Sequence, residues 1–278
     1  IWWGQWVHAA PQPSSGVCEP LAPCRGDFYE LALLAWFDQF LKGRDTGILE
    51  APAVQTQADD GLWRHAETWP PLTTRETAWH PQADGSLATA TAGSGSASYT
   101  DRTGPRPTEI ESVLDALPTV AGTPLEFIGA PLEAPLRLAG MPRLESVVTA
   151  DGQRANLVAT LFAQDENGQR RYLNFGSQSL NHVENLAQAD SDISGKALTL
   201  NLDFFPQDNV IPAGWRLVLH IAGDVPPADI SQGNGTNLLN SGPSLLPIGA
   251  GAQVSLDLAA TRLILPHNPT GPLEPRGW

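Results

Sequence analysis

The sequence has few charged residues, few basic ones and no long apolar run. Only 17% of its 278 residues are charged, and 16 Lys and Arg are outnumbered by 30 Asp and Glu, so the net charge is −14. Proteins that bind nucleic acid or anionic membranes carry clustered Lys and Arg, and no such cluster occurs here. No uninterrupted apolar stretch is long enough to span a bilayer. We therefore expect neither nucleic acid nor a membrane among the partners.

Cysteine is also scarce, with two residues in the whole chain. Cys18 and Cys24 lie close together in a Pro-rich loop, which favours one local disulfide and therefore an oxidising compartment. The alternatives are two free thiols, or half of a zinc site together with His8. No other Cys/His cluster supplies the remaining zinc ligands. We expect a disulfide, no bound metal, and a secreted or periplasmic protein.

What the sequence does have is Gly (26 residues), Pro (25) and alternating apolar residues, a mixture typical of many short strands joined by turns. From about Ala51 onward, apolar and polar residues alternate as in strands with one buried face. Strands are predicted at 125–128, 143–149, 155–162, 170–175, 198–204, 215–221, 254–258 and 262–265. Because Asp165-Glu166-Asn167-Gly168 is a turn sequence, 155–162 and 170–175 should form a hairpin. This spacing predicts a two-sheet sandwich, most simply a jelly roll.

The first fifty residues follow a different pattern. Ile1 to His8 is predicted to be a buried strand that ends at its histidine. A helix is predicted over Phe28 to Leu41, with Asp27 as N-cap and Gly43 as the left-handed stop. This helix is apolar on nearly every face, so we expect it to be buried on more than one side within a larger body. The predicted boundaries are therefore 1–50 for this segment and 51–278 for the sandwich.

Four short motifs resemble the Xaa-Pro dipeptidyl-peptidase family and its relative, cocaine esterase. Gly4-Gln5-Trp6-Val7-His8 is similar to the family's G-P-W-x-H segment, with Gln5 in place of the proline. Residues 36–43, WFDQFLKG, match its W-F-D-x-x-L-K-G helix, while Gly61-Leu62-Trp63-Arg64 and Trp69-Pro70 resemble the start of its C-terminal domain. The resemblance covers most of this chain but only the last part of a family member. It implies a mainly β chain, in which the last strand and helix of an α/β-hydrolase domain precede a C-terminal jelly roll.

The resemblance also implies a role for His8, as the general base of a Ser-Asp-His triad. In α/β hydrolases the histidine comes last in chain order, after the serine and the acid. The sequence contains no G-x-S-x-G, and Gly93-Ser94-Gly95-Ser96 lacks that spacing. We therefore expect an upstream hydrolase portion to supply the nucleophile and the acid. The chain itself would begin downstream of both, as a processed product, a recombinant piece or one half of a nicked protein.

The remaining candidates for chemistry are weaker. His220 lies on the outward phase of a predicted strand and is expected to be solvated. Asp59-Asp60, and Asp190 with Asp192, are either calcium loops or, more simply, solvated turns. Histidines are otherwise scattered, at positions 65, 80, 182 and 267. No cofactor is implied.

The leading hypothesis from the sequence is the C-terminal portion of a serine hydrolase. The whole enzyme would hydrolyse peptide, ester or amide bonds, and this chain would be inactive without the upstream part. The sequence leaves open whether the chain forms a homo-oligomer. The alternative is a non-catalytic, galactose-binding-like β-sandwich that binds carbohydrate or protein. Against this alternative, a free-standing binding module has no use for the apolar N-terminal helix.

Overall fold

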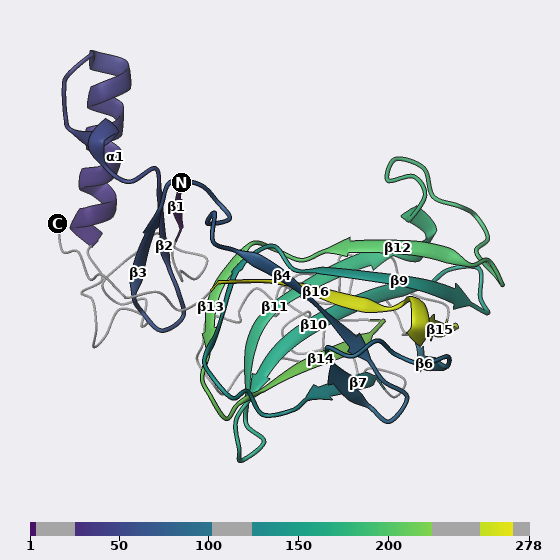
Figure 1. Ribbon diagram of the computed structural model, residues 1–278. Coiled ribbons are helices and arrows are strands. Elements are labelled where there is room, and N and C mark those ends of the chain that lie inside the picture. Colours follow the sequence, from purple (N-terminus) through teal and green to yellow (C-terminus); the bar gives the residue numbers. More distant parts are fainter. Residues whose placement is uncertain (4–25, 102–123, 224–250, 269–278) are drawn as a thin grey trace, which may run out of the picture.

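The chain is mainly β and contains one α-helix among its described residues. The computed structural model describes residues 1–3, 26–101, 124–223 and 251–268. The helix, α1 (Gly26–Lys42), stands apart from the strands at one end of the molecule (Figure 1). In the described ranges, no helix is both long and apolar enough to cross a membrane.

A small three-stranded sheet lies between α1 and the large β-structure (Figure 1). Its strands are β1 (Trp2–Trp3), β2 (Val54–Gln57) and β3 (Trp63–Ala66), with β1 parallel and β3 antiparallel to the central β2. The amino group of Ile1 donates to the carbonyl oxygen of Ala53 at 2.6 Å. A short 3-10 helix, η1 (Ile48–Glu50), precedes this sheet's β2.

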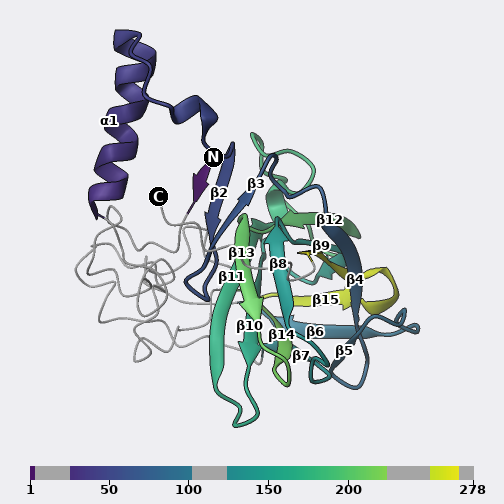
Figure 2. The same cartoon turned by 60° about the vertical axis from the view of Figure 1, so that its left-hand side comes forward.

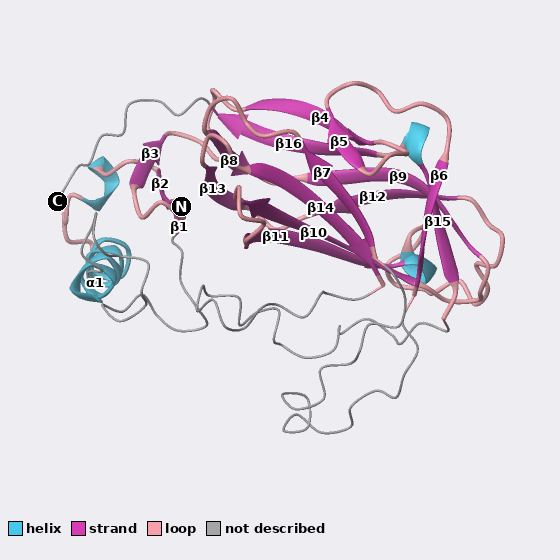
Figure 3. Ribbon diagram, turned by 90° about the horizontal axis from the view of Figure 1, so that it is seen from below, coloured by secondary structure: helices cyan, strands magenta, loops and turns pink. Residues whose placement is uncertain are grey.

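The remaining strands form two layers that face each other, seen edge-on in Figure 3. The first layer, in spatial order, contains β11 (Arg170–Ser179), β10 (Asn156–Gln164), β14 (Arg216–Ala222), β7 (Leu125–Gly129) and β5 (Ser86–Ala88). The second contains β13 (Gln207–Ile211), β8 (Leu136–Gly140), β16 (Arg262–Asn268), β9 (Arg143–Ala150), β15 (Gln253–Asp257) and β6 (Ser96–Thr100), and β12 (Leu198–Asp203) pairs with β9. Strand β4 (Arg75–Pro81) pairs with β16 and with β5 and so joins the layers. Two further 3-10 turns are η2 (Leu180–His182) and η5 (Leu258–Ala260).

The hydrophobic core of this sandwich lies between the two layers. Alternate residues of β10 and β14, such as Leu161 and Leu219, meet alternate residues of β9 and β15, such as Val148 and Leu256. Strand β10 lies between β11 and β14 and is buried on both faces, which explains why it is apolar in both phases. The predicted central strand is thus confirmed.

The predicted hairpin is also confirmed. Strands β10 and β11 pair along their whole length and are joined by residues 165–169. The carboxylate of Asp165 accepts hydrogen bonds from the backbone N–H groups of Asn167 and Gln169 at 2.9 and 2.7 Å. Gly168 has a φ of 81°, a left-handed conformation that favours glycine. The turn sequence therefore fixes the register of the two longest strands as far as Phe162, beyond which a bulge shifts it by one residue.

Candidate functional site

The residues with the strongest sequence-based assignments lie outside the described ranges. His8, the predicted general base, follows β1 by five residues and falls within 4–25. Cys18 and Cys24, the predicted disulfide, fall within the same segment. Their roles therefore remain predictions, and the described residues on either side of that segment supply the structural context.

Helix α1, which follows that segment, turns its polar side toward its own C-terminal extension. Gly43 ends the helix with a φ of 64°, and the chain then folds back along it. The Thr46 hydroxyl donates to the carbonyl oxygen of Ala35 at 3.1 Å, and the Thr46 N–H donates to Gln39 Oε1 at 3.0 Å. Asp38 accepts from Lys42 Nζ at 2.5 Å and from Arg44 Nη1 at 3.0 Å. The polar face is therefore occupied within this chain.

The apolar face of α1 is exposed. Helical spacing of 100° per residue places its large apolar side chains on one side. They are exposed to between 38% and 76% of their surface, and they are Leu33, Leu34, Trp36, Phe37, Phe40 and Leu41. Figure 2 shows the helix standing clear of both sheets. Within the described residues the sandwich does not reach the apolar face, so the expected burial of α1 on more than one side within a larger body stays a prediction.

A buried polar cluster joins the small sheet to the sandwich. Asp208 of β13 accepts two hydrogen bonds from the Arg137 guanidinium of β8, at 2.8 and 2.7 Å, and one from the Thr56 hydroxyl of β2 at 2.6 Å. The Asp208 side chain is fully buried and that of Arg137 nearly so. Because each charge is paired and hydrogen-bonded, the pair is tolerated away from water. The hydrogen bond from Thr56 to Asp208 fixes β2 against the sandwich.

Asp59 and Asp60, considered above as a calcium loop, belong to the same region. Asp59 pairs with Arg171 at 2.9 Å and accepts from the Val210 N–H at 2.6 Å. Burial raises the pKa of Asp59, and the Arg171 charge opposes that rise. Asp60 pairs in bidentate fashion with Arg64 at 2.9 and 2.5 Å, which holds the pKa of Asp60 below its ordinary value despite partial burial. These carboxylates are only partly exposed, and each is paired with an arginine.

The described residues contain no group of three or more His, Cys, Asp or Glu side chains placed to hold a metal. The Asp190–Asp192 segment likewise forms ordinary turns. Asp190 pairs with Lys196 at 2.5 Å, while its other carboxylate oxygen accepts from the Asp192 N–H at 3.1 Å. Neither of the two predicted positions, both within the described ranges, is therefore a calcium loop.

His220 is buried, contrary to the expectation that it is solvated. It lies on the face of β14 that points away from the core, as predicted, but only 6% of its surface is exposed. Its ring meets Phe162 edge-on at 6.4 Å between centroids, and Glu126 is its cross-strand partner on β7. Burial lowers the pKa of His220, while Glu126 opposes this effect and Arg170 adds to it. The alternation of apolar and polar residues along β14 predicts the face on which His220 lies, but not that this face is covered.

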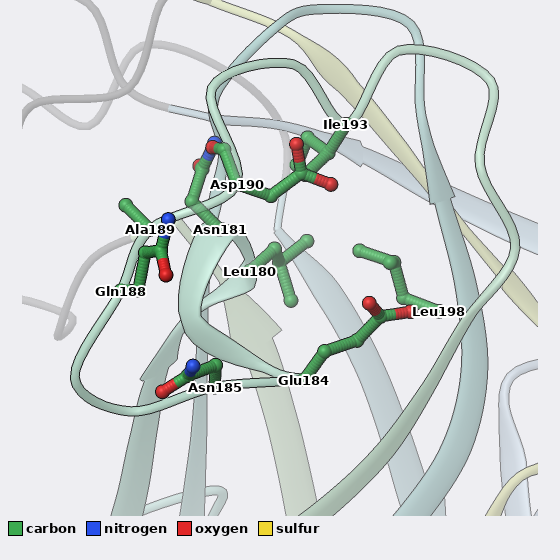
Figure 4. A pocket seen from close by; sticks show the side chains of 9 residues that line it. All are labelled: Leu180, Asn181, Glu184, Asn185, Gln188, Ala189, Asp190, Ile193 and Leu198. Carbon is green, nitrogen blue, oxygen red and sulfur yellow. The ribbon is translucent and has the colours of Figure 1, made fainter.

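A small pocket opens where the loop between β11 and β12 crosses the sandwich (Figure 4). It encloses about 190 Å³ and has a floor of three buried aliphatic side chains, Leu180, Ile193 and Leu198. The other lining residues are Asn181, Glu184, Asn185, Gln188, Ala189 and Asp190. None of the nine is aromatic, so the pocket lacks the ring surface on which sugars commonly stack.

The comparisons with known proteins agree with this architecture. Residues 46–259 match the family model of the X-Pro dipeptidyl-peptidase C-terminal non-catalytic domain. A Streptomyces avermitilis protein assigned as a Xaa-Pro dipeptidyl-peptidase is 27% identical over an alignment that covers 68% of this chain and 34% of that protein. The matched family segment begins at Thr46, at the end of the folded-back extension that follows α1. It includes the small sheet's β2 and β3 and most of the sandwich.

Solved structures extend the likeness in fold. An aminopeptidase from a marine-sediment Thaumarchaeota archaeon aligns with a TM-score of 0.69 and 18% identity, covering 95% of this chain and 48% of the aminopeptidase. An α-amino acid ester hydrolase has a TM-score of 0.69 and 16% identity, covering 96% and 50%. A CocE/NonD family hydrolase from Staphylococcus aureus has a TM-score of 0.66 and 15% identity, covering 86% and 46%. At these identities the likeness concerns the fold alone.

The chain thus spans about a third of the length of its curated relative and about half of these solved chains. The named relatives are hydrolases of the peptidase and esterase kind, whereas the matched domain is described as non-catalytic. The family match covers well over half of the chain. This protein therefore belongs to the family of X-Pro dipeptidyl-peptidase C-terminal non-catalytic domains.

Proposed function

We propose that this chain is the C-terminal part of a serine hydrolase that cleaves peptide bonds after a penultimate proline, or related ester or amide bonds. The observation that carries the proposal is the orientation of helix α1. Its polar face is covered by residues 43–46, whereas its apolar face, including Trp36 and Phe40, is open to solvent. A contiguous exposed apolar surface marks an interaction site. The upstream hydrolase portion is the partner that would cover it.

In this proposal, His8 is the general base. A serine of the upstream portion attacks the scissile carbonyl and passes its proton to the His8 imidazole, which then protonates the leaving amine or alcohol. An upstream carboxylate holds the imidazole in the correct tautomer. This chain contributes the histidine and the packing of α1, and the sandwich contributes no group to bond cleavage. Neither a metal nor a cofactor enters this scheme.

Several finer assignments belong to the same proposal. β1 and α1 would be the last strand and helix of the α/β-hydrolase domain, and the two-layer sandwich would be a jelly roll. Cys18 and Cys24 would form a disulfide, which places the protein outside the cytoplasm. The parallel pairing of β1 with β2 places the end of β1, five residues before His8, in the small sheet.

The test uses the complete protein, including the upstream portion, and a fluorophosphonate probe that labels an activated serine. His8→Ala should abolish turnover of an Xaa-Pro substrate and reduce the labelling rate at least a hundredfold, on the order of a lost general base. His182→Ala is the matched control, because that histidine lies in the loop after β11, where its Nδ1 is 3.3 Å from the Asn185 carbonyl oxygen. Retained turnover in the correctly folded His8 variant would remove His8 from the triad. Labelling of the present chain alone would contradict the assignment of the serine to the upstream portion.

A further inference from the structure

The exposed large apolar side chains of the sandwich are unevenly distributed. Four are found among its described residues and its connection to β3, namely Leu72, Met141, Leu186 and Phe205. Leu72 lies in the connection from β3 to β4, Met141 in the turn from β8 to β9, and Phe205 in the bend from β12 to β13. These three segments meet at one end of the sandwich, whereas Leu186 lies in the loop after η2.

Two close approaches bring these three segments side by side. The N–H of Phe204 donates to the Pro142 carbonyl oxygen at 2.9 Å, which places the β12–β13 bend beside the β8–β9 turn. Pro70 Cγ lies 3.3 Å from where a Cβ on Gly140 would stand, which places the β3–β4 connection beside the same turn. The ring of Phe205 also packs on that of Phe175, with 5.3 Å between centroids. We call Leu72, Met141 and Phe205 the end patch.

Strand β13, which begins beside the end patch, lies at the end of the sandwich from which the small sheet and α1 extend (Figure 1). β13, which begins just after Phe205, carries the Asp208 carboxylate that binds Thr56 of β2. The exposed fractions are 83% for Leu72, 48% for Met141 and 59% for Phe205, so most of this apolar surface faces solvent. Single exposed apolar residues need no explanation, but clustered ones at one end do.

We infer that the end patch is a second contact surface for the upstream hydrolase portion, in addition to the apolar face of α1. The inference rests on the proposed function and goes further, because it places the hydrolase portion against the sandwich itself. The solved relatives are about twice the length of this chain, so a body of comparable size is available to contact both surfaces. An apolar, uncharged patch fits the packed side chains of such a body better than a charged ligand.

The inference is tested by cysteine accessibility in the complete protein. Met141→Cys and Phe205→Cys are made separately and treated with a maleimide under native and denaturing conditions, and peptide mass mapping separates their labelling from that of Cys18 and Cys24. Leu186→Cys is the matched control, because Leu186 is 80% exposed yet lies outside the end patch. Leu41→Cys on α1 reports on the proposed function independently.

We expect the thiols introduced at positions 141 and 205 to react at least tenfold more slowly in the native complete protein than the thiol at the control position, after normalisation to the denatured rates. In the present chain alone, the same two positions should react as fast as the control. Fast labelling of both end-patch positions in the complete protein, with position 41 protected, would overturn this inference and leave the proposed function intact. Fast labelling at position 41 as well would overturn both.

Discussion

At the scale of single residues, the most consequential feature is the Arg137–Asp208 pair. The sequence does not reveal this pair, because its members are 71 residues apart and neither stands in a recognisable motif. Asp208 is instead one of the polar residues that obscure β13 as a strand, since Gln207-Asp208-Asn209 lacks an apolar alternation. The Asp208 side chain is polar because it meets the small sheet and not the hydrophobic core.

Removing one member of the pair should be costly. Asp208→Asn leaves the Arg137 guanidinium buried without its counter-charge, so we expect the free energy of unfolding to fall by about 3–5 kcal/mol. The comparison is Arg262→Gln, which breaks an ion pair with Glu145 in which the arginine side chain is 53% exposed. That change should cost about 1 kcal/mol or less. Urea unfolding measures both, and equal losses would contradict the structural role given to the buried pair.

His220 should make stability depend on pH. Because burial lowers its pKa in the folded state, the unfolded chain binds a proton more readily once the pH falls below the ordinary histidine value of 6.5. The contribution is therefore complete above that pH and is lost as the pH falls further. Glu126 stays ionised over this interval, because its pair with Arg170 lowers the pKa of Glu126.

The prediction is a comparison of the original chain with His220→Gln between about pH 7.5 and 5. The original chain should lose more stability than the variant, with the difference appearing below about pH 6.5. The midpoint of urea unfolding at each pH gives the result. Parallel pH dependence of the two proteins would mean that His220 titrates as an ordinary exposed histidine.

At the scale of elements, the sequence predicts whether a segment is a helix or a strand better than it predicts what packs against that segment. The period-two segments 198–204, 215–221 and 254–258 correspond to β12, β14 and β15, with ends that differ by a single residue. Helix α1 and its stop at Gly43 are also found as predicted, but the helix already includes Asp27, so the prediction of Asp27 as N-cap is wrong. These elements follow from local periodicity and turn chemistry, which are encoded within a few residues.

The side of α1 that faces solvent was not predictable in this way. Periodicity identifies an apolar stripe but not what covers it, because the covering surface belongs to another part of the fold. The hydrogen bond from the Thr46 N–H to the Gln39 side chain holds the returning chain on the polar side of α1. The isolated chain therefore presents the stripe outward.

Charged substitutions on the apolar face of α1 should accordingly be harmless to this chain. For Phe37→Lys combined with Leu41→Lys, we expect the free energy of unfolding to change by about 0.5 kcal/mol or less, since the two residues are 49% and 76% exposed. Self-association should decrease, because the exposed apolar surface is reduced. Light scattering and urea unfolding check the two expectations.

The matched change is Ala35→Lys, on the side where Thr46 crosses the helix, and it should destabilise the packing of residues 43–46. If the Phe37→Lys, Leu41→Lys double variant lost more than about 2 kcal/mol of unfolding free energy relative to the original chain, the apolar face would already be buried in this chain.

At the scale of the whole molecule, one end carries most of the large apolar side chains that are exposed in the described ranges. The apolar face of α1, Leu49 of η1 and the end patch share that end, while the far loops of the sandwich expose only Leu186 among large apolar side chains in the described ranges. The buried pair between Arg137 and Asp208 fixes β2 to the sandwich beside them. The described part of the chain is therefore a sandwich whose exposed large apolar side chains gather mainly at one end.

The most direct test of this account is hydrogen–deuterium exchange of α1 in the present chain and in the complete protein. If an upstream hydrolase portion covers the apolar face, backbone amides from Leu33 to Lys42 should exchange at least about tenfold more slowly in the complete protein, as expected when local opening of a helix is suppressed. The amides of β10 should exchange equally in both proteins. Equal exchange of α1 in the two proteins would show that nothing upstream packs on the helix, and would contradict the central claim.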